Sequence, residues 1–360
     1  MERLTKQFDS RRTESTPGPL VRAWRDGDAA AWDHYVCSHP RATFFHQSGW
    51  KRVLEKTFAY PDRSLVAERD GRICGVLPLF ACRSLRGGKG LYSLPHTVYG
   101  GPLGDDRAGE EALLAVARDL RASLGANALE LRNRHAPTLE LPPLGGFVTF
   151  ERELPGTREE VYRTFPKKAR EMINQATKRH RLTADFKSGL DTFYDLLADS
   201  YHSLGTPVFP RRFFAAMLEE FPEASSILVV RHAGTPVSTV LSMEFRGTML
   251  PLYSGEAPGV RNLKSNNFKY YRLMEYAVER GLSRFDFGRS RSDNEGAVRF
   301  KTNQGFRAEP LPYQLERTDG GTPSVSSPNR GVFLKARRIW RRLPRGIARR
   351  LGPPIVRVFP

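Results

Sequence analysis

The sequence predicts an α/β protein built from two copies of one unit. Apolar residues from Tyr270 to Val278 recur at helical spacing, and Gly281 stands where a helix needs a left-handed C-terminal residue. Phe285 and Phe287 then alternate with polar residues in a short strand. This helix and strand close the second copy.

An earlier part of the chain repeats this order. ERDGRICGVLPL resembles RHAGTPVSTVLS, and SLGANALELR resembles ERGLSRFDFG. Each copy reads as hairpin, strand, helix and strand, with the hairpin turns at Asp70-Gly71 and Ala233-Gly234. Such self-similarity indicates a duplicated α/β unit, and chance recurrence of common hairpins is the alternative.

The first copy is preceded by two short helices. Ala29 to Val36 reads as a helix that His39-Pro40 ends, and Thr43 is a candidate cap for a second helix through Trp50 and Leu54. The copy itself is then expected as a hairpin over 65–80, a strand at 91–94, a helix over 109–124 and a strand at 129–132.

A segment rich in Pro and Gly, 141–155, is the expected join between the halves. A helix over 159–180 opens the second half, and its copy ends in the strand at Phe285 and a polar loop, 289–296. The expected domains are a mobile N-terminus over 1–20, domain 1 over 21–150, domain 2 over 151–319, a linker over 320–329 and a basic tail over 330–360.

Composition bounds the class of protein. The 360 residues suffice for about two domains, and 39% hydrophobic residues indicate a globular protein. No apolar run approaches the ~20 residues that span a bilayer, and the N-terminus is too polar for a signal peptide. The three cysteines have no metal-ligand spacing. We therefore expect a cytoplasmic protein without a metal site.

Two tandem units that close on FDFG, a polar loop and RFKTNQGF resemble the FemAB group of transferases. The resemblance covers about residues 25–315 and is most specific at HPRATFFHQSGWKRVL, AERDGRICGVLPL, PKKAREMINQATKRH and 285–306. It implies two tandem GNAT-like acetyltransferase domains with mixed central sheets flanked by helices. The similarity is greatest to FemAB-like proteins associated with exosortase and PEP-CTERM exopolysaccharide loci.

The resemblance also implies an activity. FemAB proteins move an amino acid from aminoacyl-tRNA onto the peptide of a peptidoglycan precursor, and the Phe-Lys of their last strand lies at the reaction centre. In this sequence that pair is Phe300 and Lys301. The chain lacks the helical arm that some members insert in the second domain, so it offers less surface for tRNA.

The candidate catalytic residues at this edge are Lys301, Phe300 and Asp286. Lys301, next to Phe300, can stabilise the oxyanion of a tetrahedral intermediate, and the alternative is a surface lysine at a strand end. Asp286, at the end of a strand, can act as a base or orient an amine. Pairing of Asp286 with Arg284 or Arg289 is the alternative.

A second group of polar residues suits a phosphate. Lys167, Lys168 and Arg170 are close enough to surround the diphosphate of a nucleotide or lipid-linked sugar, or an RNA backbone, although a solvated helix face explains them as well. Asn266 and Asn267 are candidates to cap the helix and leave its amides facing an anion. The candidate substrate and phosphate residues are Lys167, Lys168, Arg170, Asn266, Asn267 and Arg289.

Loops of the first copy hold further candidates. His39, His46, His96 and Tyr99 lie in segments that can line a cleft, and packed or solvent-facing side chains are the alternative. Trp50 and Phe44 are expected in the core.

The C-terminal tail is amphipathic and basic. No acidic residue follows Asp319, whereas ten Arg or Lys do, and an apolar stripe runs along one side of a short helix that Pro344 ends. An interfacial helix on anionic lipid fits this pattern. The alternatives are a nucleic-acid arm and a helix docked on the protein itself. The candidate membrane contacts are Phe333, Arg337, Arg338, Trp340, Arg341 and Arg342.

These observations predict an N-acyltransferase or aminoacyltransferase that forms an amide on a cell-envelope precursor of the exopolysaccharide or peptidoglycan type, linked to a nucleotide or lipid. The donor is acyl-CoA or aminoacyl-tRNA, without a tightly bound cofactor. The expected partners are that precursor, tRNA, and the inner face of the cytoplasmic membrane through the tail. The alternative is a non-catalytic protein that binds a precursor or bridges an exopolysaccharide synthesis complex to the membrane.

Overall fold

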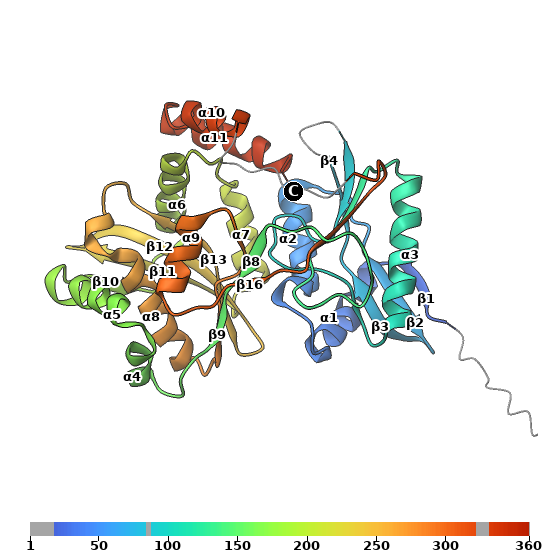
Figure 1. Ribbon diagram of the computed structural model, residues 1–360, viewed down its shortest axis with the longest axis horizontal. Helices are drawn as coiled ribbons and strands as arrows, with labels where there is room; N and C mark the ends of the chain where they lie inside the picture. The colour runs from blue at the N-terminus through green and yellow to red at the C-terminus, as the bar shows by residue number, and fades with distance from the viewer. Residues whose placement is uncertain (1–17, 84–87, 322–330, 360) are drawn as a thin grey trace, which may run out of the picture.

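The structure is a computed structural model that describes residues 18–83, 88–321 and 331–359. Two halves lie side by side, the first on the right of Figure 1 and the second on the left. The expected N-terminal segment and linker fall largely outside the described residues, which omit 1–17 and 322–330.

The first half is built on two four-stranded sheets, with strand orders β1-β2-β3-β6 and β17-β7-β5-β4. Pro78 stands between β3 and β4, and because proline has no N–H to donate, it separates the two sheets there. The elements of this half are β1 (Leu20–Ala23), α1 (Ala29–Ser38), α2 (Ser48–Phe58), β2 (Leu65–Arg69), β3 (Arg72–Leu77), β4 (Phe80–Arg83), β5 (Lys89–Tyr92), β6 (Leu103–Gly104), α3 (Arg107–Ser123) and β7 (Ala128–Leu131).

The second half is built on one six-stranded sheet, β10-β11-β12-β13-β14-β9, with a small sheet, β15-β8-β16, beside it. Its strands are β8 (Phe147–Thr149), β9 (Glu151–Glu153), β10 (Thr183–Asp185), β11 (Ser225–His232), β12 (Thr235–Phe245), β13 (Thr248–Glu256), β14 (Arg284–Asp286), β15 (Ser290–Arg291) and β16 (Glu309–Pro310). Its helices are α4 (Arg158–Val161), α5 (Lys167–Asn174), α6 (Leu190–Leu204), α7 (Arg211–Glu220), α8 (Ser265–Glu279) and α9 (Glu295–Asn303). The last strand, β17 (Gln314–Arg317), joins a sheet of the first half.

The predicted duplication is present in the structure. The two hairpin turns have φ values of 52° and 72° at Asp70 and Gly71, and of 47° and 81° at Ala233 and Gly234. Positive φ at both central residues is the geometry of the tight hairpin turn that twists with its strands. In each half a helix then connects two parallel strands, β5 to β7 through α3 and β13 to β14 through α8.

The helix expected over 159–180 is broken. Pro166 follows Phe165, whose extended φ and ψ of −82° and 143° are typical of a residue before proline. The segment therefore divides into α4, a short 3₁₀ turn and α5, which ends in a π-helical turn, Gln175–Arg179.

Aromatic side chains join the two halves. The rings of Trp50 in α2 and Phe213 in α7 lie 6.0 Å apart, and those of Phe44 and Phe221 lie 4.7 Å apart. Trp50 and Phe44 are buried, as expected. Because one hydrophobic cluster contains residues of both halves, the interface between them is a core rather than a hinge.

The end of the chain returns to earlier elements. Strand β17 lies within the range expected for domain 2, but it pairs antiparallel with β7 of the first half. The tail forms α10 (Gly331–Trp340) and α11 (Arg345–Arg357), which lie above α6 in Figure 1. Within the described ranges, no helix combines the length and apolar content needed to cross a membrane.

Candidate functional site

The end of β14 separates two environments. Arg284 and Asp286 line a cavity of about 170 Å³ that faces the first half. Phe285 and Phe287 belong to the hydrophobic cluster beneath α8. This is the alternation expected of a strand, whose successive side chains point to opposite faces. The carboxylate of Asp286 is therefore directed toward the junction between the halves.

Tyr99 of the first half holds this carboxylate. The Tyr99 hydroxyl donates to Asp286 Oδ2 at 2.9 Å, and the Gly288 amide donates to Asp286 Oδ1 at 2.7 Å. Thr149 Oγ1 lies 2.6 Å from the Tyr99 hydroxyl. Asp286 is only 4% exposed, and burial raises its pKa. Tyr99 thus lines the cleft as expected, and the pairings of Asp286 with Arg284 or Arg289 are not formed.

Charged side chains line the same cavity. Arg134 forms an ion pair with Glu151, and its guanidinium lies 5.5 Å from the centroid of the Tyr99 ring. Arg246 donates to the carbonyl of His39 at 2.6 Å. Nothing in the local sequence around Arg134 marks it as a site residue, because its partners lie in other strands. The cavity combines cations with the buried Asp286 and the half-buried Glu151, which suits a polar ligand.

Phe300 and Lys301 do not lie on a strand, so that expectation was wrong. They belong to α9, which begins where the Asn294 side chain accepts from the amide of Ala297 at 3.2 Å. Glu295 in the first turn and Lys301 in the last turn both complement the helix dipole. These local signals favour a helix.

Lys301 nevertheless reaches the end of β14. Its Nζ donates to the carbonyls of Phe287 at 2.9 Å and Gly288 at 3.0 Å, and it lies 4.8 Å from the centroid of the Phe150 ring. Burial lowers its pKa to about 8, and the charge of Asp286 opposes that shift. Phe300 packs against Tyr270, with ring centroids 5.7 Å apart.

Gly288 connects the two predicted catalytic side chains. Its amide donates to Asp286 and its carbonyl accepts from Lys301. Asp286 faces the cavity with Tyr99, whereas Lys301 lies with the aromatic rings on the α8 side. The structure therefore brings these residues to the same strand end, but from opposite faces of the sheet.

A second buried lysine, Lys269 of α8, was not predicted. Its Nζ donates to Ser238 Oγ at 2.9 Å, Ser254 Oγ at 2.6 Å and Asn266 Oδ1 at 2.8 Å. Its residue exposure is 0%, and burial lowers its pKa to about 7. In the sequence it is one of several lysines on an amphipathic helix, and no spacing distinguishes it.

The predicted capping by asparagine is not formed at α8. The helix begins at Ser265 after Lys264, whose φ of 59° is left-handed, and no side chain caps it. Asn266 instead accepts from Lys269. Asn267 lies in the first turn of the helix. The anion-binding role of these two residues remains a prediction.

The predicted phosphate cluster lies near the end of α9. Lys167 and Lys168 are exposed at the start of α5. Pro166, the residue before Lys167, packs against Gly305, which follows the end of α9 by two residues. A Cβ built on Gly305 would lie 3.2 Å from the Pro166 ring. Arg170 lies over the Tyr162 ring at 5.9 Å. Phosphate binding here remains a prediction.

Arg289 packs on two aromatic rings. Its guanidinium lies 4.8 Å from the centroid of Phe147 and 5.8 Å from that of Tyr313. This position uses the flat face of the guanidinium as a packing surface. Its contact with a substrate remains a prediction.

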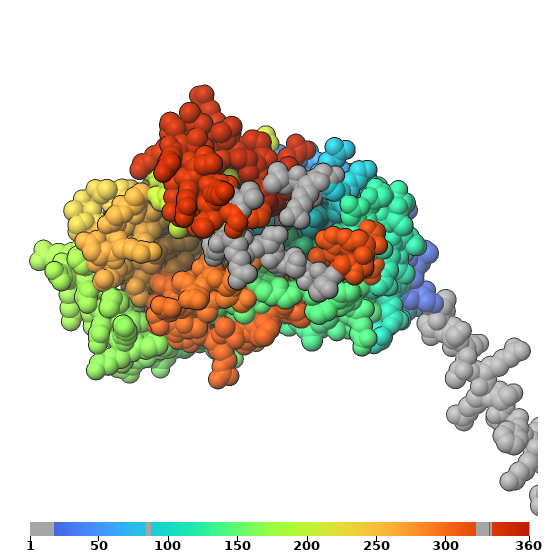
Figure 2. Space-filling model, turned by 45° about the horizontal axis from the view of Figure 1, so that its top comes forward, coloured from blue at the N-terminus to red at the C-terminus, as the bar shows by residue number. Residues whose placement is uncertain are grey.

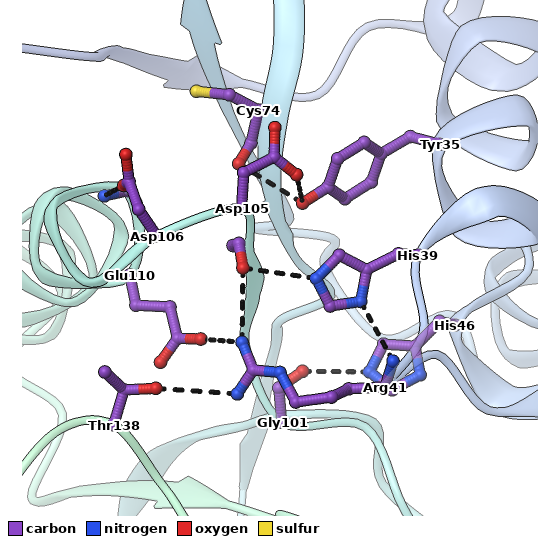
Figure 3. A network of polar contacts seen from close by, with 12 residues as sticks. Tyr35, His39, Arg41, His46, Cys74, Gly101, Asp105, Asp106, Glu110 and Thr138 are labelled. Carbon is purple, nitrogen blue, oxygen red and sulfur yellow. Dashed lines mark hydrogen bonds and ion pairs between the residues drawn. The ribbon is translucent and has the colours of Figure 1, made fainter.

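The histidines of the first half hold loops in place. His39 Nε2 and Arg41 Nη2 lie 3.1 and 3.2 Å from the carbonyl oxygen of Gly104. Arg41 also pairs with Glu110 (Figure 3). His46 Nε2 lies 2.9 Å from the carbonyl of Gly101, and burial lowers its pKa to about 4.

The His96 ring also has a hydrogen-bond partner, because its Nε2 lies 2.9 Å from the Tyr60 hydroxyl. Burial lowers its pKa to about 3. A neutral histidine that is hydrogen-bonded to a backbone carbonyl or a phenol has a structural role. His39, His46 and His96 are therefore packed side chains, which is the alternative given for them above.

Comparison with known proteins identifies a matching domain family and solved structures of similar fold. Residues 161–302 match the acetyltransferase (GNAT) domain family. No curated protein matches the sequence. The structure is similar to the crystal structure of FemX, with a TM-score of 0.64 and 15% identity over 82% of this chain and 96% of that one.

Two further solved structures are similar in fold. A tandem GNAT protein from the clavulanic acid biosynthesis pathway has a TM-score of 0.52 and 11% identity, over 83% of this chain and 97% of that one. The C-terminal domain of a putative lysylphosphatidylglycerol synthetase from Agrobacterium fabrum has a TM-score of 0.51 and 14% identity, over 82% and 92%. The chain therefore has a tandem GNAT-like fold, with its match to the acetyltransferase (GNAT) domain in the second half.

Proposed function

We propose that this chain is an acyltransferase that forms an amide on a cell-envelope precursor. The observation that carries the proposal is the position of Lys301, whose ammonium lies at the end of β14 inside the segment that matches the GNAT domain. The fold shared with FemX supports it, as does the sequence resemblance to the FemAB group.

Lys301 suits the stabilisation of an oxyanion. An ammonium has three N–H donors, and the carbonyls of Phe287 and Gly288 take two of them. We assign the third donor to a substrate oxygen. When an amine attacks the acyl carbonyl, a C–N bond forms, negative charge develops on that oxygen, and the C–O or C–S bond to the donor then breaks. A donor held in place before the reaction stabilises that charge without reorganisation.

Asp286 is the proposed acceptor of the amine proton. Its carboxylate lines the cavity between the halves, and its raised pKa makes it a stronger base than an ordinary aspartate. The acceptor amine then approaches from the cavity, while the donor carbonyl lies at the strand end near Lys301. Gly288, whose amide donates to Asp286 and whose carbonyl accepts from Lys301, marks the proposed meeting point of the two substrates at the strand end.

The donor we propose is acyl-CoA or an aminoacyl-tRNA. Acyl-CoA is the typical donor of GNAT domains. The acceptor we propose is a nucleotide- or lipid-linked saccharide or peptide of the exopolysaccharide or peptidoglycan type. Lys167 and Lys168 are the proposed contacts for its phosphates, because both are exposed beside the end of α9.

Turnover of labelled donors tests the proposal. The purified chain is mixed with labelled acetyl-CoA or aminoacyl-tRNA and a cell-envelope precursor extract, and amide products are detected by mass spectrometry. Lys301→Ala is expected to lower kcat by ~100 to 1,000-fold because it removes an oxyanion donor. Lys187→Ala, in an exposed loop of the same half, is the matched control and is expected to keep full activity.

Two outcomes contradict this function. Full turnover in Lys301→Ala would remove the assigned role. Binding of a precursor without turnover of either donor would instead favour the non-catalytic alternative, a precursor-binding or bridging protein.

A further inference from the structure

The two C-terminal helices are fixed to the body of the protein by one face. Arg345 pairs with Asp199 at 3.0 Å, and Arg349 pairs with Asp195 at 2.7 Å. The His202 Nε2 lies 2.8 Å from the carbonyl of Leu343. The tail is therefore a folded part of the surface, which supports the docking alternative for this face.

Close packing continues along α11. A Cβ on Gly352 would lie 2.7 Å from the carbonyl oxygen of Val208, so only glycine permits this approach. Val356 is buried in the cluster shared by the two halves. Tyr60 of the first half donates to the carbonyl of Arg357 at 2.7 Å. The tail thus contacts both halves of the protein.

The opposite face of the same helices exposes large apolar side chains. Within residues 18–83, 88–321 and 331–359, seven large apolar side chains are exposed, and five belong to this segment. Ile339 is 64% exposed. The five exposed apolar residues of the tail are Leu334, Ile339, Ile347, Leu351 and Phe359. Figure 2 shows this segment, in red, as a raised ridge along the top of the molecule.

Cations lie among these apolar residues. Arg338 follows Leu334 by four positions in α10, and Arg350 follows Ile347 by three positions in α11, which are the spacings of neighbours on a helix surface. Arg342 lies just beyond the end of α10.

These three arginines differ from those that hold the tail in place. Arg338, Arg342 and Arg350 are exposed, and no carboxylate of the described residues lies within ion-pair distance of them. The arginines of the tail therefore divide into those that bind α6 and those that face outward.

We propose that the outward face of α10, α11 and Phe359 is a docking surface for an anionic lipid bilayer. Apolar side chains enter the boundary between headgroups and acyl chains, while arginines contact the lipid phosphates. An RNA backbone would satisfy the cations but would leave the exposed Leu and Ile side chains in water, so the mixed composition favours lipid. This inference does not depend on the proposed acyl transfer.

The structure changes which residues we assign to this surface. Arg337 and Arg341 donate to the carbonyl of Leu204, and Trp340 lines a small cavity against α6. Phe333 packs against Phe359, with ring centroids 6.3 Å apart. Of the residues predicted from the sequence, Arg338 and Arg342 keep the outward position.

Vesicle flotation with the full chain tests this inference. Vesicles of phosphatidylcholine with phosphatidylglycerol are compared with vesicles of phosphatidylcholine alone, at low and high salt. We expect flotation with the anionic vesicles, weakened by salt because surface charges are screened. Ile339→Glu combined with Leu351→Glu is expected to lower the bound fraction at least ~10-fold, because two apolar anchors are lost.

Matched variants distinguish binding through this surface from non-specific binding to vesicles. Leu20→Glu changes a side chain that is 69% exposed on β1, and it is expected to float like the unmodified chain. Arg338→Ala combined with Arg342→Ala is expected to reduce flotation only with anionic vesicles. Thermal melting tests whether each variant is folded. We expect all of them to fold, because the changed side chains are exposed.

Three results would overturn the inference. They are no flotation with anionic vesicles at low salt, equal flotation of the Ile339→Glu, Leu351→Glu variant, and binding to RNA without binding to lipid.

Discussion

The hydroxyl of Tyr99 donates to Asp286 Oδ2 at 2.9 Å, although the two residues are 187 positions apart in the chain. Tyr99 belongs to the first half and Asp286 to the second. The first half therefore supplies part of the environment of the proposed base, and the duplication joins the two units in one site.

Removal of this hydrogen bond is expected to change the acid limb of the pH profile. In Tyr99→Phe the carboxylate of Asp286 loses a donor that lowers its pKa, so that pKa rises further. The acid limb of kcat is expected to move to higher pH, with about tenfold lower turnover near neutrality. The measurement is kcat across pH for both chains.

Tyr194→Phe is the matched control for this change. Its hydroxyl also donates one bond, to the carbonyl of Phe209 at 3.1 Å, far from the cavity. We expect an unchanged pH profile in this control. An acid limb that stays in place in Tyr99→Phe would show that Asp286 is not the titrating base.

The alkaline limb is expected to report Lys301. Burial lowers its pKa to about 8, so the ammonium that the mechanism needs is lost as pH rises through that value. Arginine keeps its charge at this pH, so Lys301→Arg is expected to move the alkaline limb upward, at a lower kcat because its geometry differs. An alkaline limb at the same pH in both chains would exclude Lys301 as its source.

Lys269 is expected to make stability depend on pH. Its folded pKa of about 7 lies below its ordinary value of 10.5, so between these values the unfolded chain holds a proton that the folded chain lacks. Its contribution to the free energy of unfolding therefore rises with pH across this window, by at most ~1.4 kcal/mol per pH unit.

Urea unfolding of the unmodified chain and of Lys269→Met, at steps across that window, measures this contribution. The difference between the two chains isolates Lys269 from other titrating groups. Parallel dependence on pH in both chains would mean that the lysine is charged in the folded state.

The contact of α11 with the body is expected to depend on Gly352. Gly352→Ala places a methyl 2.7 Å from the Val208 carbonyl oxygen, and the overpacking is expected to cost ~1 to 3 kcal/mol. Gly346→Ala lies in the same helix with open space around it, so it is expected to be neutral or slightly stabilising. The rate at which a protease cleaves the tail measures the effect of each variant. Equal cleavage of Gly352→Ala and Gly346→Ala would contradict the close contact between Gly352 and Val208.

Local patterns were sufficient for the repeated unit. The turns at Asp70-Gly71 and Ala233-Gly234, and the glycine after α8, are set by neighbouring residues, so the sequence predicts them correctly. Phe300 and Lys301 were placed on a strand by resemblance, whereas the Asn294 cap favours a helix. Asn294 is therefore the local signal for a helix in this part of the sequence.

Local sequence patterns do not predict contacts between residues that are far apart in the chain. Nothing near Tyr99 indicates that it meets Asp286, and nothing near Lys269 indicates that α8 buries it beneath two serines. Such contacts depend on how the sheets are placed against each other. The sequence therefore indicates which residues of the strand end and of α9 are candidates, but not the hydrogen bonds that they make.

Strand β17 has a consequence for the order in which the molecule is made. Because Gln314 to Arg317 completes the sheet that contains β7, the first half lacks this edge strand until residues 314–317 have been synthesised. We therefore expect the sheet of the first half to be completed only after the second half has been synthesised. A gene fragment that ends at the join between them is expected to yield an open sheet edge, prone to aggregation, rather than an independent domain.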